Sequence, residues 1–142
     1  MTTLNSRKWT FEDSLDLYNI RQWGNGYFSA NEKGNLVVQP GGIGAPSVDM
    51  KDLVDEVRQR GIGAPLLIRF SQILKARVIE LNEAFLRAIA EYGYQGTYRG
   101  VFPIKVNQQR QVVEEVFKHG RAYQFGLEAG SKPELLAVMA IA

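Results

Sequence analysis

The feature that most constrains the fold is a regular alternation of strand-like and helix-like segments from residue 49 onward. Apolar runs at 65–70, 97–106 and 122–130 each precede a helical pattern, and they recur at intervals of roughly 25 to 30 residues. Strands separated by helices at this spacing are typical of right-handed parallel βαβ units. The sequence therefore predicts an α/β fold with about three βα units.

The first two helices have clear start and stop signals. Asp49 is expected to cap a helix that ends at Gly61, because a short acceptor side chain binds free N–H groups and glycine ends a helix without strain. Ser71 is expected to begin a longer helix, which Gly93 closes.

The later helices differ in their final turns. The segment 109–120 is expected to form a helix that stops at Gly120, and 131–134 matches a capping box with proline in the first turn. The helix that follows this box carries no stop signal up to Ala142. We therefore expect the chain to be a portion of a longer protein.

Residues 1–50 have a different, aromatic and turn-rich character. Thr10 can cap a short helix, and the segments 26–30 and 35–40 are expected to be short strands on either side of a turn. We therefore expect two domains, a β-rich N-terminal arm over 1–50 and the first part of the α/β domain over 51–142. The large aromatic side chains of the arm are expected to form its core rather than a substrate cage; they are Trp9, Tyr18, Trp23, Tyr27 and Phe28.

Composition excludes several kinds of site. The chain has no cysteine and one histidine, so disulfides, thiolate metal sites and a histidine cluster are ruled out. A net charge of +2, spread along the sequence, gives no indication of nucleic-acid binding. No signal peptide and no apolar run of roughly 20 residues is present, so a cytoplasmic protein with no membrane association is expected.

Lys105 is the strongest candidate for a chemical role. It lies near the end of the 97–106 run, on a face expected to point inward, and alternation gives that face Arg99, Val101, Pro103, Lys105 and Asn107. Loss of hydration at such a position lowers the pKa of a lysine, and the neutral amine can attack an aldehyde. A lysine that merely leaves the strand and extends into solvent fits the same pattern. The residues alone leave both interpretations open.

Longer segments carry a resemblance to a known family. PIKVN (103–107) resembles the cofactor-lysine segment of pyridoxal-phosphate decarboxylases that have an alanine-racemase-like barrel. Four blocks resemble consecutive parts of biosynthetic arginine decarboxylases; they are LYNIRQWGNGYFSANEKGNLVVQP, LLIRFSQIL, GVFPIKVNQQ and QFGLEAGSKPEL. The resemblance implies that 51–142 begins a parallel (β/α)8 TIM-type barrel that binds pyridoxal phosphate. It also implies that 1–50 belongs to the second, β domain of the family.

The resemblance implies a function as well. Lys105 would be the catalytic and cofactor-binding residue, which forms a Schiff base with pyridoxal 5'-phosphate. The full-length protein would decarboxylate L-arginine to agmatine in putrescine and spermidine biosynthesis, and would form a homo-oligomer. Magnesium is associated with the family, but we identify no metal ligands. Glu128 is a weaker candidate near the cofactor, with solvent exposure or an ion pair to Lys132 as the alternative, and Asn107 is expected to cap a helix.

Two alternatives remain open. The protein could be a decarboxylase of the same fold that acts on ornithine or diaminopimelate, or a non-catalytic fragment that binds pyridoxal phosphate. Family segments that hold the cofactor phosphate and the pyridine nitrogen are missing from the sequence. The 142-residue chain by itself is therefore expected to lack activity.

Overall fold

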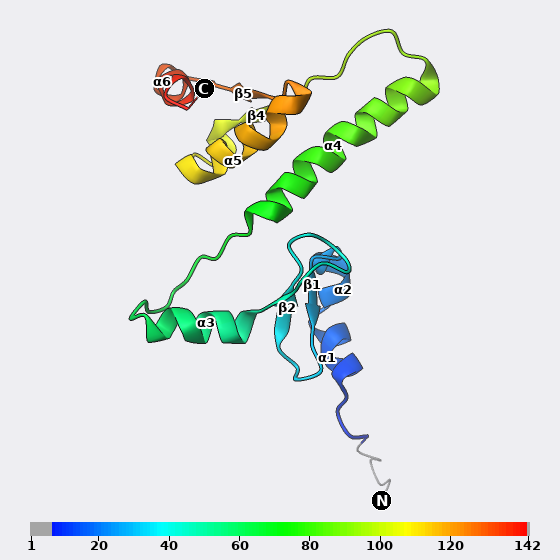
Figure 1. Ribbon diagram of the computed structural model, residues 1–142, viewed down its shortest axis with the longest axis vertical. Helices are drawn as coiled ribbons and strands as arrows, with labels where there is room; N and C mark the ends of the chain where they lie inside the picture. The colour runs from blue at the N-terminus through cyan, green and yellow to red at the C-terminus, as the bar shows by residue number, and fades with distance from the viewer. Residues whose placement is uncertain (1–6, 142) are drawn as a thin grey trace, which may run out of the picture. The chain divides into compact units, whose positions relative to one another are not determined.

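The computed structural model describes residues 7–141, which form two compact units divided between Arg69 and Phe70 (Figure 1). The first unit contains a small antiparallel sheet with three helices, and the second contains a parallel strand pair with three more. The predicted domain boundary after residue 50 stays a prediction, since it concerns domains of a longer protein.

An antiparallel sheet forms the centre of the first unit. Its strands are β1 (Phe28–Ala30), β2 (Leu36–Val38) and β3 (Val48–Asp49), in the order β1-β2-β3. The first two strands confirm the predicted hairpin, with Phe28 opposite Val38 across it. Val37 and Val38 are buried, so the sheet contributes the apolar core.

Two short helices, α1 (Phe11–Leu17) and α2 (Ile20–Gly24), lie beside this sheet (Figure 1). Thr10 caps α1 as predicted. Its hydroxyl accepts the Asp13 N–H at 3.3 Å, and the Asp13 carboxylate accepts the Thr10 N–H at 2.8 Å. Both groups of the capping box are thus satisfied, and Leu15 of α1 is buried.

The expectation that the large aromatic residues form the core of this unit is wrong for three of them. Trp9, Tyr18 and Trp23 are 62%, 66% and 51% exposed, respectively. The buried positions belong instead to small and branched aliphatic side chains, which fill the narrow space between two short helices and a hairpin.

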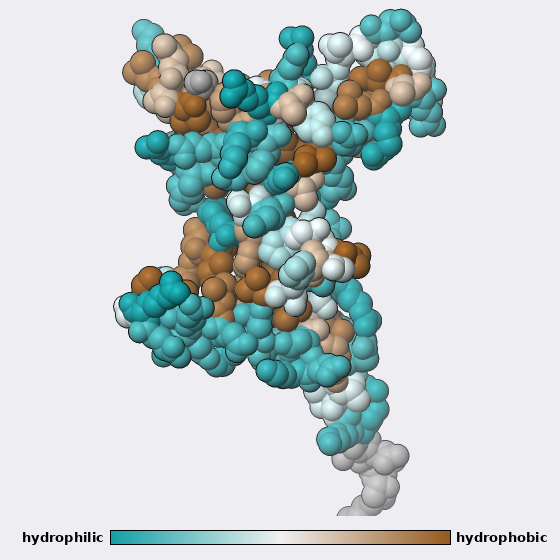
Figure 2. Space-filling view, in the orientation of Figure 1, coloured by the Kyte–Doolittle hydropathy of each residue, from teal (hydrophilic) through white to brown (hydrophobic). Residues whose placement is uncertain are grey.

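Helix α3 (Met50–Gln59) is capped by Asp49, as predicted. The Asp49 carboxylate accepts the Lys51 N–H at 2.9 Å, and it also accepts the side-chain amides of Asn31 and Asn35 at 2.7 and 2.9 Å. These bonds, the one from Asn35 foremost, hold the pKa of Asp49 below its usual value of 3.8. Figure 2 shows hydrophilic side chains gathered along α3, which agrees with the charged residues on its exposed side.

The predicted strand at 65–70 is wrong. Residues 66–70 have no regular secondary structure, the segment pairs with no strand among the residues that the structure describes, and Leu67 is 71% exposed. A parallel strand forms its ladder only with a neighbouring strand, so apolar composition alone does not produce one.

The second unit opens with the long helix α4 (Ser71–Tyr92), which begins and ends where the sequence predicts. Gly93 adopts φ = 60°, the left-handed conformation that glycine reaches without strain, and closes the helix. The helix contacts α5 (Arg110–Gly120), and the Tyr123 hydroxyl donates to the Glu83 carboxylate of α4 at 2.8 Å.

The strands β4 (Val101–Pro103) and β5 (Gly126–Glu128) are parallel and are joined through α5. This unit confirms the predicted α/β class with a small parallel sheet. Residues 7–141 contain two parallel strands rather than the three expected, because 65–70 is unpaired. The core of the unit is apolar and includes Ile104, Val112, Val113, Val116 and Phe125.

Gly120 is the last residue of α5, as the sequence predicts. A turn of 3-10 helix, η2 (Arg121–Tyr123), continues the chain, which reverses at Gln124 with φ = 55°. A Cβ atom on Gly120 would lie 2.6 Å from the Phe125 Cβ, and one on Gly100 would lie 2.2 Å from the Phe125 Cε2. Both glycines therefore serve close packing against Phe125.

Candidate active site around Lys105

Lys105 lies just beyond the carboxyl end of β4. The strand ends at Pro103, and a turn of 3-10 helix, η1 (Ile104–Val106), carries the lysine. The prediction of a continuous strand over 97–106 is wrong on both sides of β4, since residues 97–100 and 104–106 lie outside the strand. Proline has no N–H to donate to a strand ladder, so the apolar alternation continues into a turn rather than a strand.

The predicted alternation of faces is correct as far as Ile104. Gly100 and Ile104 are buried, whereas Val101 and Lys105 on the other side are exposed. Val106, which the alternation places with the packed residues, is exposed because the turn has already changed the direction of the chain.

The ammonium group of Lys105 is exposed. It makes no hydrogen bond or ion pair with any residue from 7 to 141. The residues that the structure describes therefore do not remove water from the Lys105 ammonium group, although the sequence predicts that they would. What these residues do provide is a free primary amine held at the edge of a sheet.

Asn107 fixes the exit from the turn. Its side-chain oxygen accepts the Gln109 N–H at 3.1 Å, just before α5 begins at Arg110. The capping role expected for Asn107 is wrong, because the N-cap of α5 is Gln109; the Asn107 bond instead closes a turn just before the helix. Together with the burial of Ile104, it anchors the backbone on both sides of Lys105.

Glu128 ends β5 at the same edge. In the parallel register Pro103 lies opposite Glu128, so Lys105 and Glu128 both stand at the carboxyl ends of adjacent strands. Ligands in parallel α/β sheets bind at this edge. Glu128 is exposed, and it forms no ion pair with Lys132 among the described residues.

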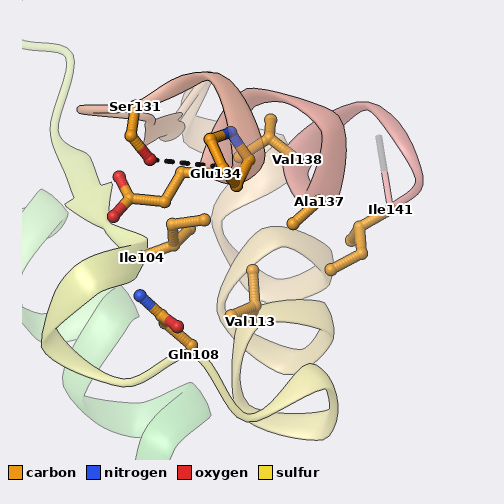
Figure 3. Close-up of a pocket in the computed structure, with 9 residues that line it drawn as sticks. Ile104, Gln108, Val113, Ser131, Glu134, Ala137, Val138 and Ile141 are labelled. Carbon is orange, nitrogen blue, oxygen red and sulfur yellow. Dashed lines mark hydrogen bonds between the residues drawn. The ribbon is translucent and has the colours of Figure 1, made fainter.

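A cavity of about 260 Å³ lies at this edge, between the end of β4 and the helices α5 and α6 (Lys132–Met139) (Figure 3). Polar groups enter it from Gln108, Ser131 and Glu134. Its apolar wall consists of Ile104, Val113, Pro133, Ala137, Val138 and Ile141. Ile104 lines the cavity, whereas its neighbour Lys105 does not.

The sequence predicts the start of α6 only in part. The Ser131 hydroxyl accepts the Glu134 N–H at 3.3 Å, as in a capping box. The Glu134 carboxylate, however, accepts the N–H of Gly130 at 2.7 Å instead of that of Ser131. Sequence reasoning also missed Gln108 as a residue that lines the cavity. The signal that could have identified it is its position in the sequence, three residues after Lys105.

The described residues contain no group of three histidine, aspartate or glutamate side chains placed to hold a metal ion. No helix within residues 7–141 has the length and apolar character needed to cross a membrane.

No family model matches the chain. Its relatives nevertheless define a class, since they are biosynthetic amino-acid decarboxylases. The chain is 54% identical over 132 residues to the biosynthetic arginine decarboxylase of Gloeobacter violaceus, a match that covers 93% of the chain and 20% of that protein. It is 52% identical over 141 residues to that of Thermosynechococcus vestitus, covering 99% of the chain and 22% of that protein.

A solved structure gives the same result. The biosynthetic arginine decarboxylase of Campylobacter jejuni matches with a TM-score of 0.77 and 37% identity, over 87% of the chain and 20% of that protein. The chain is thus related to part of the biosynthetic arginine decarboxylases, which confirms the predicted resemblance. It spans about a fifth of the length of the relatives it matches.

Proposed function

We propose that this chain is the N-terminal portion of a lyase that decarboxylates L-arginine to agmatine in polyamine biosynthesis. The proposal rests on sequence identity of about one half with arginine decarboxylases over nearly the whole chain. The parallel β4–α5–β5 unit also supports it as the start of a TIM-type barrel, since Lys105 stands where barrel active sites lie. A homo-oligomer and a cytoplasmic location remain predictions for the full-length protein.

Lys105 is the residue that would hold pyridoxal 5'-phosphate. The described residues fit this cofactor in one respect, because Lys105 offers an exposed amine with no partner from residue 7 to residue 141. When bound, the cofactor draws into its ring the electron pair left on the α-carbon as the carboxylate departs. The described residues give no support to a magnesium site.

The rest of the turn has a positioning role. Buried Ile104 anchors the backbone before Lys105, and the bond from Gln109 to Asn107 anchors it after. The amine is therefore attached to a backbone that is fixed on both sides, which lowers the entropy cost of placing it against an aldehyde. Gln108 offers an amide at the neighbouring cavity, where it can orient a polar group.

The test is carbon dioxide release from L-arginine by the full-length protein and its Lys105→Ala variant. We expect activity to fall by a factor on the order of 10³ or more, because the cofactor loses its covalent anchor. Lys75→Ala, which changes an exposed lysine of α4, is the matched control and should retain activity. Full activity in Lys105→Ala would overturn the role of the lysine.

A panel of amino acids separates the alternatives. If carbon dioxide is released preferentially from ornithine or diaminopimelate, that amino acid is the substrate in place of arginine. Visible cofactor absorbance that depends on Lys105, without turnover of any amino acid in the panel, would indicate a non-catalytic binding protein.

A further inference from the structure

A hollow of about 660 Å³ opens within the first unit, between α1, α2 and the turn that joins β1 to β2. Four aromatic rings line it, those of Trp9, Phe11, Tyr18 and Trp23. Such a gathering of exposed rings around one concave surface is not needed for the core of the unit, which is aliphatic.

The two indole rings are held in place by their own N–H groups. Trp9 Nε1 donates to the Ser14 hydroxyl at 2.8 Å, and Trp23 Nε1 donates to the Tyr18 carbonyl at 2.9 Å. The Trp23 ring also packs against Phe28, with centroids 5.1 Å apart. Because the polar atoms are satisfied, the rings present apolar, electron-rich surface in a fixed arrangement.

Two opposite charges complete the lining. Glu32 and Lys33 lie in the β1–β2 turn and both border the hollow. Neither forms an ion pair within residues 7–141. Aromatic faces attract organic cations, a carboxylate adds to that attraction, and an ammonium group attracts a carboxylate. The set is therefore complementary to a ligand that carries both charges.

We propose that this hollow binds a free amino acid with a cationic side chain. The guanidinium or ammonium group lies against the aromatic rings, Lys33 binds the α-carboxylate and Glu32 binds the α-ammonium group. The choice of arginine as the first probe rests on the proposed function. All residues of the hollow belong to the first unit, whereas Lys105 belongs to the second.

Intrinsic fluorescence tests the proposal directly, because the sequence has two tryptophans and both line the hollow. Titration of the chain with L-arginine is expected to give a saturable change in emission. Tyr18→Leu, which keeps both tryptophans, should weaken binding by roughly three- to thirtyfold, the range of one cation–π contact. Glu56→Gln, an exposed change on α3 outside the hollow, should bind like the unaltered chain.

Ligand and charge variants separate the two contacts. Lys33→Gln should weaken arginine but leave agmatine, which has no carboxylate, unchanged. Norleucine, which has the same α-groups on an apolar side chain, should bind at least tenfold more weakly than arginine. An equal response to norleucine, or no response to arginine, would overturn the proposal.

The same titration with the full-length protein, followed by acrylamide quenching, tests whether another polypeptide segment fills the hollow. Shielded tryptophans that do not respond to arginine would also overturn the proposal. Lys105→Ala should leave the fluorescence titration unchanged, so loss of decarboxylation and loss of this binding can be told apart.

Discussion

The side chain of Phe125 leaves room only for glycine at two positions, 100 and 120. This side chain lies so close to Gly100 and to Gly120 that an added Cβ atom would stand 2.2 Å from the Phe125 Cε2 at Gly100 and 2.6 Å from the Phe125 Cβ at Gly120. Phe125 is itself buried, so the ring has little room to move. Glycine is required here by packing rather than by a special backbone angle.

Gly120→Ala is accordingly expected to lower the free energy of unfolding of the second unit by about 1–3 kcal/mol, the usual cost of overpacking. Gly100→Ala should cost a similar amount. The double variant should lose less than the sum, because both changes displace the same ring. Urea denaturation measures all three, and Gly63→Ala, with no atom within 4 Å of the added Cβ, is the control that should change little. Additive losses would contradict a shared cause.

At the scale of the element, Asp49 ties a helix to a hairpin. One carboxylate caps α3 and accepts two asparagine side chains from the β1–β2 turn. These bonds require the ionised form, and they lower the pKa of Asp49 in the folded state. The cap is thus one part of the first unit that acid disrupts by a defined route.

The direction in which pH changes the stability of the first unit follows from the lowered pKa of Asp49. With a folded pKa below 3.8, Asp49 contributes its full stabilisation above that value, and the contribution is lost as pH falls below it through the folded pKa. We expect the Lys51 amide resonance in NMR spectra to move with the same midpoint, because its N–H bonds the carboxylate.

In Asp49→Asn the acid-dependent movement of the Lys51 resonance should disappear, while Glu32→Gln should retain it. A Lys51 resonance that titrates identically in Asp49→Asn would show that another group causes the change.

Sequence reasoning succeeded where an element is defined by its own residues. Thr10, Asp49 and Gly93 act on backbone groups within a few positions, so their roles were predictable. The strands at 65–70 and 97–106 depend on partners elsewhere in the chain, and apolar composition says nothing about whether a partner is present. For the same reason the position of Lys105 was predictable, but its exposure was not, because hydration depends on what packs around it.

At the scale of the whole molecule, each unit has its own buried core, and both tryptophans lie in the first unit. Val116 of α5 is buried in the second core and Val38 of β2 in the first. Fluorescence therefore follows the first unit, whereas far-ultraviolet circular dichroism is dominated by the long helices of the second.

Val116→Ala is expected to cost about 1–3 kcal/mol and to lower the midpoint of the circular-dichroism transition while leaving the fluorescence transition unchanged. Val38→Ala should lower the midpoint of the fluorescence transition and leave the circular-dichroism transition unchanged. Urea titrations with both probes on the same sample decide the matter. A common shift of both transitions by either variant would mean that the two cores unfold as one.

The segment 65–70, which joins no sheet among residues 7–141, has a consequence for the time course of protein synthesis. It is largely apolar and is exposed at Leu67, and apolar segments of this kind tend to pair with the strand edges of other chains. The strand β4 is translated only after the whole of α4, so the segment leaves the ribosome well before β4 exists. Pro65, which cannot donate to a ladder, and Arg69, which brings a charge, are the kinds of residue that oppose such pairing, and we expect them to do so during this interval.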